Sequence, residues 1–382
     1  MNAKVFANPL MPQLSILERF EETLREYNMM YTKQNGRKLT PVAQYILQAQ
    51  HQPSLQKFGS IYFIFKVHKD PVVARPIVAS IGSITYHASK YVSEILLPVA
   101  RRARTYIRDS TELVGILEHT TFPSDCVILT ADVVELYPSI VLQDGLAALR
   151  YALGRAGFDN RFADFITDLA ALVLRNNYIR FGDKIFLQIK GTAMGTPLAV
   201  AFAIIYLAVI EEEVFTECAK DPLFRKPYLL KRFIDDIFSL FASSYDALLF
   251  VSVFNNRRPG HLRLTHKLSS SDGVFMDIEV FKGPRFHDSN HFDLRLYQKP
   301  MNLYLYLPSC SFHPIAVKRG FIRAELARLR LRCTSDTDYT SVRDAFYQRL
   351  VARGYSHSFL THCFDIVLDR SVLVKRHCRH NS

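Results

Sequence analysis

Two adjacent aspartates inside an apolar run constrain this chain more than any other feature of its sequence. The segment KRFIDDIFSLF, residues 231–241, carries Asp235 and Asp236 between hydrophobic side chains. Ionised carboxylates are costly to bury unless they are paired or hold a metal ion. A short apolar run interrupted only by this pair predicts a β-hairpin with both carboxylates at its turn.

A third aspartate, Asp132, stands beside another apolar run. Its segment CVILTADVVELYPSI, residues 126–140, predicts a buried strand followed by a turn near Pro138. Neighbouring carboxylates repel each other unless a cation lies between them. Magnesium prefers such hard oxygen ligands together with phosphates and water, and two magnesium ions form a clamp for in-line displacement at phosphorus. Because Asp pairs on turns are also common as solvated caps, the pair alone leaves both interpretations open.

The charge balance favours a polyanionic partner. The 382 residues include 48 Lys plus Arg against 36 Asp plus Glu, a net charge of +12. Residues 315–382 alone hold 13 basic against 6 acidic side chains. Such an excess is typical of proteins that bind nucleic acid or an anionic membrane, and a solvated basic face without a partner is the alternative. The hydrophobic fraction of 49% is ample for a core.

The remaining totals favour an intracellular protein. The six cysteines form no CxxC pair, which suits reduced and mostly buried thiols. The first residues lack the pattern of a signal peptide. The longest apolar run, residues 197–210, is too short to span a bilayer comfortably and predicts a buried helix. We expect an intracellular and, more narrowly, a nuclear protein with no membrane partner.

The predicted elements mix helices and strands without the regular order of a βαβ series, which predicts an α+β fold. Apolar residues at helical spacing predict helices at 14–31, 85–103, 144–175, 197–210 and from 317 onward. Strand pairs are expected at 61–80, 178–191 and 229–241, with further strands at 261–283 and 292–306.

In chain order these segments resemble the motif series of reverse transcriptases, and most of all the series of the Penelope-like retroelements. FKVHK with ARPIV resembles the fingers hairpin, ILTADVVELYPSI the first catalytic strand, QIKGTAMGTPLAV the glycine-containing loop and helix, and RFIDDIFSLF the box usually written YxDD. FMDIEVF and LRLYQKPMNLYLYLPSCSFHP resemble the downstream strand and the primer-gripping region. SCSFHP, followed by a basic helix and RGY at 353–355, points to the Penelope-like branch.

The resemblance covers residues 66–354 and implies a right-hand polymerase architecture with fingers, palm and thumb. The implied divisions are an N-terminal helical region and fingers at 1–110, a palm of antiparallel sheet and helices at 111–285 with a fingers insertion at about 140–185, and a primer-grip region with a basic helical thumb at 286–382. The implied activity is that of a retroelement RNA-directed DNA polymerase. Its partners would be an RNA template, a DNA primer and dNTP substrates. The tail after RGY shows no GIY-YIG module, which is expected either of a lineage without this nuclease, with an endonuclease supplied in trans, or of a truncated copy.

The resemblance also implies a set of metal ligands. Asp132, Asp235 and, less directly, Asp236 would bind two magnesium ions, for which manganese can substitute. These ions would activate the primer 3′-hydroxyl and neutralise the incoming triphosphate. Within the pair, Asp235 is the stronger candidate for a ligand.

Other residues would bind the nucleotide. Lys66 and Arg75 on the fingers hairpin would hold the triphosphate, with arginine as a bidentate fork and lysine as a point charge; a solvated hairpin face is the alternative. Tyr137 would lie beneath the sugar and exclude a 2′-hydroxyl, unless it is merely a core aromatic. A hairpin-to-helix turn that needs unusual φ would explain the glycines of the next motif equally well. The predicted lining of the nucleotide and template side is Gln188, Gly191 and Gly195.

Two further predictions concern basic residues. Lys267 is a candidate general acid for the pyrophosphate leaving group. The helix from 317 combines an apolar face with arginines that would grip the phosphate backbone of template and primer without reading sequence. The apolar face consists of Ile322, Leu326 and Leu329, and the gripping residues are Arg319, Arg323 and Arg330.

The sequence departs from the family pattern at two positions near these motifs. Phe65 stands where the family often has proline, and Phe233 replaces the tyrosine of YxDD. Both changes leave the charged groups intact. The alternative function is a catalytically inactive or domesticated nucleic-acid-binding protein derived from a reverse transcriptase. RNA synthesis on the same fold is disfavoured by Tyr137, and a metal nuclease does not explain the ordered motifs.

Overall fold

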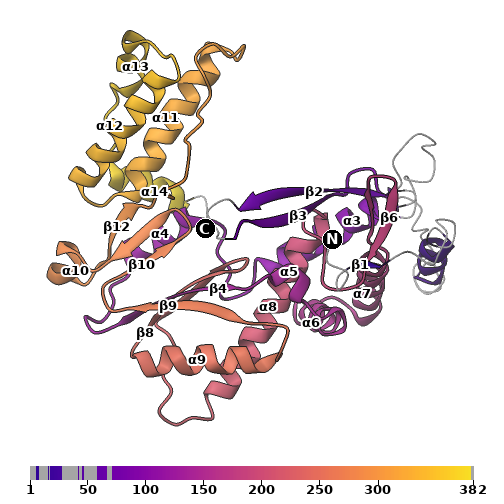
Figure 1. The fold of residues 1–382 in the computed structure, drawn as a ribbon. Coiled ribbons are helices and arrows are strands. Elements are labelled where there is room, and N and C mark those ends of the chain that lie inside the picture. The colour runs from indigo at the N-terminus through magenta and orange to yellow at the C-terminus, as the bar shows by residue number, and fades with distance from the viewer. Residues whose placement is uncertain are drawn as a thin grey trace. The chain divides into compact units, whose positions relative to one another are not determined.

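The chain folds into two compact units, each assembled from segments that are distant in the sequence. This computed structural model describes residues 6–7, 16, 18–27, 42, 45–46, 58–66 and 71–379. The first unit comprises Met1–Tyr106, Val133–Asp221 and Phe250–Leu264, and the second comprises Ile107–Asp132, Pro222–Leu249 and Thr265–Ser382. Helices and strands are mixed in both (Figure 1), which confirms the predicted α+β class.

The first unit holds a five-stranded sheet in the order β1-β6-β5-β2-β3. β2 and β3 form the long antiparallel hairpin predicted for the fingers, although its expected turn at Asp70 lies outside the described residues. β5 and β6 form the second predicted hairpin, closed by Gly182 and Asp183 between the paired residues Phe181 and Lys184. The strands are β1 (Phe6–Ala7), β2 (Gly59–Lys66), β3 (Val73–Ala79), β5 (Tyr178–Phe181) and β6 (Lys184–Gln188).

Helices pack together in the same unit, with α8 lying against α3 and α6, and α7 also contacting both of these. The helical stretch predicted at 144–175 is in fact two helices. Gly157 has a φ of +90°, and the side chain of Asp159 accepts a hydrogen bond from the Phe162 amide and caps the second helix. The helices are α3 (Tyr86–Ala100), α5 (Leu136–Ser139), α6 (Leu142–Arg155), α7 (Asn160–Arg175) and α8 (Pro197–Cys218).

α8 is the buried helix predicted from the apolar run, and it continues to Cys218. It starts at Pro197, which suits the first turn of a helix because proline has no amide hydrogen to leave unpaired. Glu211 is buried within it, where its carboxylate accepts a hydrogen bond of 2.6 Å from the Thr105 hydroxyl. In the part of the chain that the structure describes, no helix is long and apolar enough to cross a membrane.

The second unit contains two small sheets, β7-β8-β4-β9 and β10-β11-β12. β4 is the predicted first catalytic strand, and β7 with β8 forms the predicted hairpin around the aspartate pair. α9 (Ser244–Arg257) follows this hairpin. The strands are β4 (Val127–Val133), β7 (Leu229–Phe233), β8 (Asp236–Phe241), β9 (Leu264–Ser269), β10 (Asp272–Phe275), β11 (Ile278–Phe281) and β12 (Asp293–Leu296).

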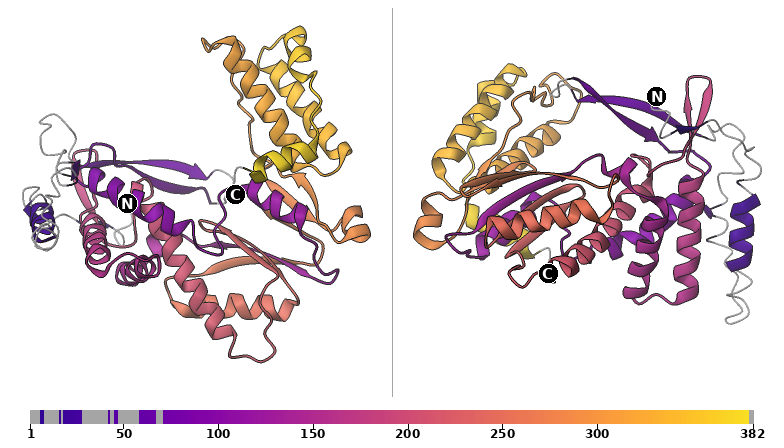
Figure 2. Two further views of the ribbon diagram at one scale, coloured as in Figure 1. Left: turned by 180° about the vertical axis from the view of Figure 1, so that it is seen from behind. Right: turned by 60° about the horizontal axis from the view of Figure 1, so that its bottom comes forward.

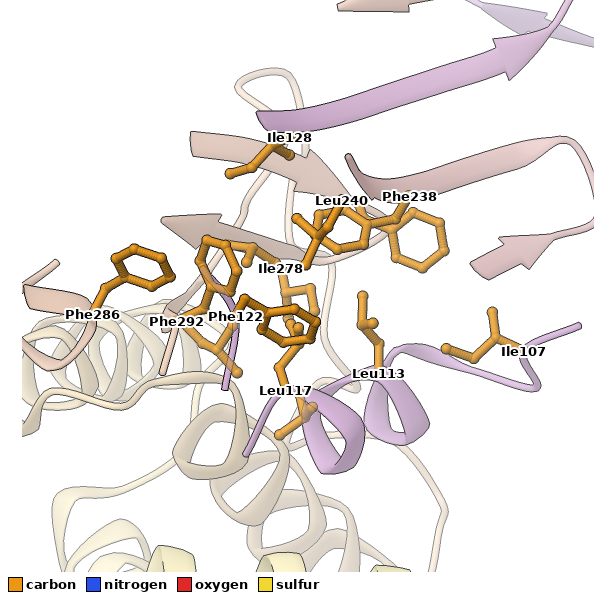
Figure 3. Packing of buried hydrophobic residues seen from close by; sticks show 14 of the residues in the cluster. Ile107, Leu113, Leu117, Phe122, Ile128, Phe238, Leu240, Ile278, Phe286 and Phe292 are labelled. Atoms are coloured by element: carbon orange, nitrogen blue, oxygen red, sulfur yellow. The ribbon is translucent and has the colours of Figure 1, made fainter. Parts of the chain in front are cut away.

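A hydrophobic core joins these sheets to α4 (Ser110–His119) and α10 (Pro284–Ser289). Figure 3 shows Leu113 and Leu117 of α4 pointing toward Phe238 and Leu240 of β8. Ile128 of β4 belongs to the same cluster. The strands that carry the aspartates are therefore anchored at one end in a closed core.

The C-terminal segment of the second unit is a bundle of helices, seen in orange and yellow in Figures 1 and 2. α11 packs against both α12 and α13. The predicted apolar face of α11, formed by Ile322, Leu326 and Leu329, is fully buried in this bundle, so that prediction is confirmed. The helices are α11 (Ile315–Arg332), α12 (Asp336–Ala352), α13 (His357–Phe364) and α14 (Arg370–Arg379).

One predicted strand is largely wrong. The segment 292–306 was expected to be extended throughout, yet β12 ends at Leu296, and no regular element follows until α11. Pro300 lacks the amide hydrogen that a strand interior requires. Tyr304 has a positive φ of 48°, which is incompatible with a continuous strand.

Candidate active site

The sheet of the second unit brings the three predicted metal ligands together. β4 and β8 run antiparallel with Asp132 directly opposite Asp236. Residues paired in this way point to the same face of a sheet, so the two carboxylates are neighbours. Asp235 occupies the two-residue turn between β7 and β8, next to the pair Phe233 and Asp236. The register thus places all three aspartates at one end of the sheet.

The face with Asp132 and Asp236 continues along the strands into the closed core. Side chains alternate between the faces of a strand, so Ile128 shares the face of Asp132, and Phe238 with Leu240 shares the face of Asp236. All three apolar residues are buried in the cluster of Figure 3. The carboxylates therefore lie at the open end of a face whose other end excludes water.

This setting perturbs the Asp236 carboxyl. Its pKa is raised to about 6, first by burial and then by the negative charges of Asp132 and Asp235, against which the Lys299 ammonium acts. Burial disfavours the charged form of a carboxyl, and nearby carboxylates add to the penalty. A bound cation would relieve both effects, and such perturbed groups gather at functional sites.

The donor set fits magnesium, because three carboxylates supply the hard oxygen ligands that this ion prefers. The charges of Asp132 and Asp235 both act on Asp236. Across the described residues, however, no three His, Cys, Asp or Glu side chains converge as a ready-made metal-binding group. The backbone register gathers the three aspartates at one end of the sheet, and their role as metal ligands stays a prediction.

The turn that holds Asp235 is strained. Ile234 has a φ of 56°, in the left-handed region that β-branched residues avoid. Such a conformation costs about 1–3 kcal/mol and persists only where the surroundings enforce it. One enforcing contact is visible: the guanidinium of Arg232 donates a hydrogen bond of 2.9 Å to the Ile234 carbonyl oxygen. Sequence analysis gave Arg232 no role.

The fingers hairpin of the first unit presents both predicted triphosphate ligands on one face. Ile64 pairs with Arg75, and Lys66 pairs with Val73. Because side chains two residues apart share a face, Lys66 and Arg75 are diagonal neighbours on that face. Arg75 is exposed and Lys66 is half-buried.

Tyr137 and the two predicted glycines belong to one arrangement in the first unit. The Thr192 amide donates a hydrogen bond of 2.9 Å to the Tyr137 carbonyl, and a Cβ on Gly191 would overlap this carbonyl and the backbone of Pro138. A Cβ on Gly195 would likewise overlap the Val78 carbonyl of β3. Both glycines have positive φ, 67° and 105°. The alternative explanation of the glycines, a turn that needs unusual φ, is therefore confirmed. Their contact with a nucleotide stays a prediction.

Gln188 has internal partners at both ends of its amide. Its carbonyl oxygen accepts a hydrogen bond of 2.7 Å from Asn177, and its amide nitrogen donates one of 2.8 Å to the Lys190 carbonyl. The side chain is buried. Gln188 therefore fixes the start of the glycine-containing loop, and its predicted nucleotide contact stays a prediction.

Two lysines bear on the prediction of a general acid, which stays a prediction for Lys267. The predicted general acid, Lys267, is exposed on β9 and lies 3.7 Å from the Asp272 carboxylate. The cation that acts on Asp236 is Lys299, in the irregular segment after β12. No sequence pattern predicts a role for Lys299, although it stands in the QKP stretch of the primer-gripping motif.

The three predicted template-gripping arginines of α11 differ in availability. Arg319 and Arg323 are exposed, and the guanidinium of Arg319 lies 5.9 Å from the centre of the Phe359 ring. Arg330 instead binds Asp336 at 2.7 Å and is mostly covered. Backbone contact with nucleic acid therefore remains a prediction for Arg319 and Arg323, whereas Arg330 is used within the fold.

Comparison with known proteins places this geometry in a fold class. The telomerase from Candida albicans, solved in complex with a TWJ fragment of telomeric RNA, matches with a TM-score of 0.55 at 11% identity over 92% of this chain and 61% of that one. The RNA-dependent RNA polymerase of BmCPV matches with 0.52 at 12% identity, over 85% and 32% respectively. That of a human picobirnavirus matches with 0.51 at 11% identity, over 80% and 58%.

These similarities show the right-hand fold of nucleic-acid polymerases, with its antiparallel sheet and helices, as the sequence predicted. The chain spans less than two thirds of each of the three proteins. One protein family, described as an animal helix-turn-helix domain, matches residues 305–365, which contain α11 and α12. No curated protein matches the chain.

Proposed function

We propose that this protein is a reverse transcriptase, an RNA-directed DNA polymerase of a retroelement of the Penelope-like type. One observation carries the proposal. In a polymerase fold, Asp132 lies opposite Asp236, and Asp235 sits in the adjoining turn. Three carboxylates at the end of an antiparallel sheet match the needs of two-metal nucleotidyl transfer.

In the proposed mechanism the three aspartates hold two magnesium ions, which supply activation of the primer 3′-hydroxyl and charge neutralisation at the triphosphate. Asp132 contributes from β4, while Asp235 and Asp236 contribute from the hairpin. Lys66 and Arg75 bind the triphosphate from the face that they share. Arg319 and Arg323 contact the phosphates of the template–primer duplex.

The choice of DNA as product rests on Tyr137. The similar solved structures include both a telomerase and RNA-dependent RNA polymerases, so the fold alone does not decide between dNTP and rNTP. Tyr137 stands in α5, five residues after Asp132 and against the glycine-containing loop. A bulky ring at this point would exclude a 2′-hydroxyl. Parallel extension with dNTP and rNTP on one RNA template distinguishes the two activities.

Primer extension on an RNA template with a DNA primer tests the proposal. We expect magnesium-dependent addition of dNTP by the wild-type protein, and a loss of at least about 100-fold in Asp132→Ala and Asp235→Ala, because several kcal/mol of metal stabilisation are removed. Both variants should still fold and bind template–primer. Unchanged extension by Asp235→Ala would remove the assigned site.

The helix-turn-helix match at residues 305–365 supports a second candidate, a nucleic-acid-binding protein derived from a reverse transcriptase and no longer catalytic. This candidate predicts that the protein binds template–primer but extends it with no divalent ion and no nucleotide. The three aspartates and both fingers cations favour the active enzyme. The proposed setting is nuclear, with an endonuclease supplied in trans.

A further inference from the structure

Arg232 is buried three positions before Asp235. Only 1% of its surface is exposed, although it carries a charged guanidinium. It pairs with Ile237 across the hairpin, and Ile237 alternates with Asp236 along β8. Arg232 therefore lies on the face opposite to that of Asp236 and Asp132. It approaches the catalytic turn from beneath the sheet.

One of its contacts is with the strained turn residue. The Nη1 atom of Arg232 donates a hydrogen bond of 2.9 Å to the Ile234 carbonyl oxygen. This carbonyl and the amide of Asp235 belong to the same planar peptide unit. A bond that fixes the carbonyl therefore also fixes the peptide plane from which Asp235 projects.

Because Ile234 is strained, the hydrogen bond from Arg232 helps to keep its backbone in this conformation. With a φ of 56°, an isoleucine tends to return to an ordinary backbone conformation unless other contacts prevent it. A hydrogen bond from a charged donor is stronger than one from a neutral donor, and burial increases its strength. The backbone of Arg232 is itself anchored, because its carbonyl accepts a hydrogen bond of 3.1 Å from the Ile107 amide.

We propose that Arg232 is a positioning residue for the catalytic turn: it holds the Ile234 peptide in its strained conformation and so directs Asp235 toward the metal ions. The inference rests on the proposed polymerase function. Lysine cannot replace arginine here, because an ammonium lacks the rigid planar fork of the guanidinium.

Kinetics of single-nucleotide addition test the inference with Arg232→Lys and Arg232→Gln. The matched control is Ser239→Ala: Ser239 lies on the same face of the sheet, is fully buried, and donates a hydrogen bond of 2.7 Å to the Leu229 carbonyl, away from the turn. We expect kcat to fall by roughly 30-fold or more in both Arg232 variants, with KM for dNTP within about threefold. The magnesium concentration for half-maximal rate should rise at least about threefold, since the ligand is misdirected.

A general destabilisation of the sheet gives a different pattern. If the Arg232 substitutions only destabilised the sheet, they would lower the amount of folded protein, as Ser239→Ala would. They would leave the magnesium dependence of the folded fraction unchanged. Wild-type kcat and magnesium dependence in folded Arg232→Lys would overturn the inference. An equal rise of the magnesium requirement in Ser239→Ala would overturn it too.

Amide hydrogen exchange provides a readout that does not depend on catalysis. We expect faster exchange in the peptide 229–241 of Arg232→Lys than in that of Ser239→Ala, because the turn is released. If the wild-type protein extends no primer, the proposed function fails, and exchange alone then decides the positioning role. Equal exchange in the wild-type protein and Arg232→Lys would contradict that role.

Discussion

Of the three hairpins that close with a two-residue turn in the described part of the chain, β5–β6 and β7–β8 turn with different residues. The β5–β6 hairpin turns at Gly182 and Asp183, and the β7–β8 hairpin turns at Ile234 and Asp235. In each turn only the first residue has a positive φ, 60° for Gly182 and 56° for Ile234. Glycine adopts this conformation without a steric cost, whereas a β-branched residue is strained by it.

The difference separates a turn that needs no supporting contact from the turn that we propose to be catalytic. Gly182 needs no support, and a Cβ placed there would meet no atom within 4 Å. Ile234 is held by the buried Arg232 and precedes the pair of carboxylates. Strained backbone concentrates at functional sites, where the surrounding structure enforces it. The β7–β8 turn has a positive φ at a residue other than glycine, and the β5–β6 turn does not. The β10–β11 turn shares this feature at Met276, with a φ of 55°. Its Asp277, however, pairs with Arg328 and Arg332.

The largest expected effect contrasts the two aspartates that occupy the same position in these turns. Asp235→Asn should lower the rate of nucleotide addition at least about 100-fold, because a neutral amide replaces a metal ligand. Asp183→Asn should leave the rate within about twofold, since Asp183 is exposed on a turn outside the site. Equal losses in both variants, measured under single-turnover conditions, would erase the distinction between the hairpins.

The second effect is on the pH dependence of stability. The pKa of Asp236 is about 6 in the folded chain, against an ordinary value of 3.8. As the pH rises from about 4 to above 6, the unfolded chain ionises first, so the folded state loses up to about 3 kcal/mol. Asp236→Asn lacks this loss, and its stability relative to the wild-type protein should therefore rise over the same interval. Urea unfolding in EDTA measures the difference, and parallel profiles would contradict the perturbed carboxyl.

A third effect isolates packing from backbone strain at glycines with positive φ. Gly182→Ala should lower the free energy of unfolding by about 1 kcal/mol, the cost of the left-handed conformation alone. Gly191→Ala should cost more, about 3 kcal/mol, because its Cβ would also overlap the backbone of Tyr137 and Pro138. Urea unfolding at one pH compares the two variants. An equal loss of unfolding free energy in the two variants would show that the glycine-containing loop shifts to accommodate the new Cβ without further destabilisation.

The smallest effect extends the contrast to the arginines of α11. Arg319→Gln and Arg323→Gln should each weaken template–primer binding a few-fold and reduce the salt dependence of the affinity by about one phosphate contact. Arg330→Gln should leave the salt dependence unchanged, because the Arg330 side chain is mostly covered and is already paired with Asp336. Fluorescence anisotropy at several salt concentrations measures all three variants. An equal reduction of the salt dependence of the affinity in Arg330→Gln would show that the ion pair of Arg330 with Asp336 opens on binding.

Much of the fold followed from local sequence patterns. The turn residues Gly182 and Asp183 located one hairpin, a short apolar run interrupted by the aspartate pair located another, and helical spacing located the apolar face of α11. The apolar run that became α8 was correctly interpreted as a buried helix. These features depend on contacts between residues that are close in the sequence, and each of them carries its own local signal.

Other features depend on partners that are distant in the sequence. Nothing near Asp132 indicates that it lies opposite Asp236 rather than Asp235. Arginine is seldom buried, so Arg232 gave no sign that it reaches under the turn. Arg330 was indistinguishable in sequence from the exposed Arg323 until Asp336 was seen beside it. The interleaving of the two compact units likewise has no local signal.

The most direct test of the account is the addition of one dNTP to a DNA primer on an RNA template, by the wild-type protein and by Asp132→Asn. Asp132 lies on β4, outside both hairpins, and reaches the site only through its pairing with Asp236. We expect magnesium-dependent addition by the wild-type protein, and a rate at least about 100-fold lower in the variant at unchanged template–primer affinity. Equal rates in the two proteins would contradict the assignment of the three aspartates as the catalytic site.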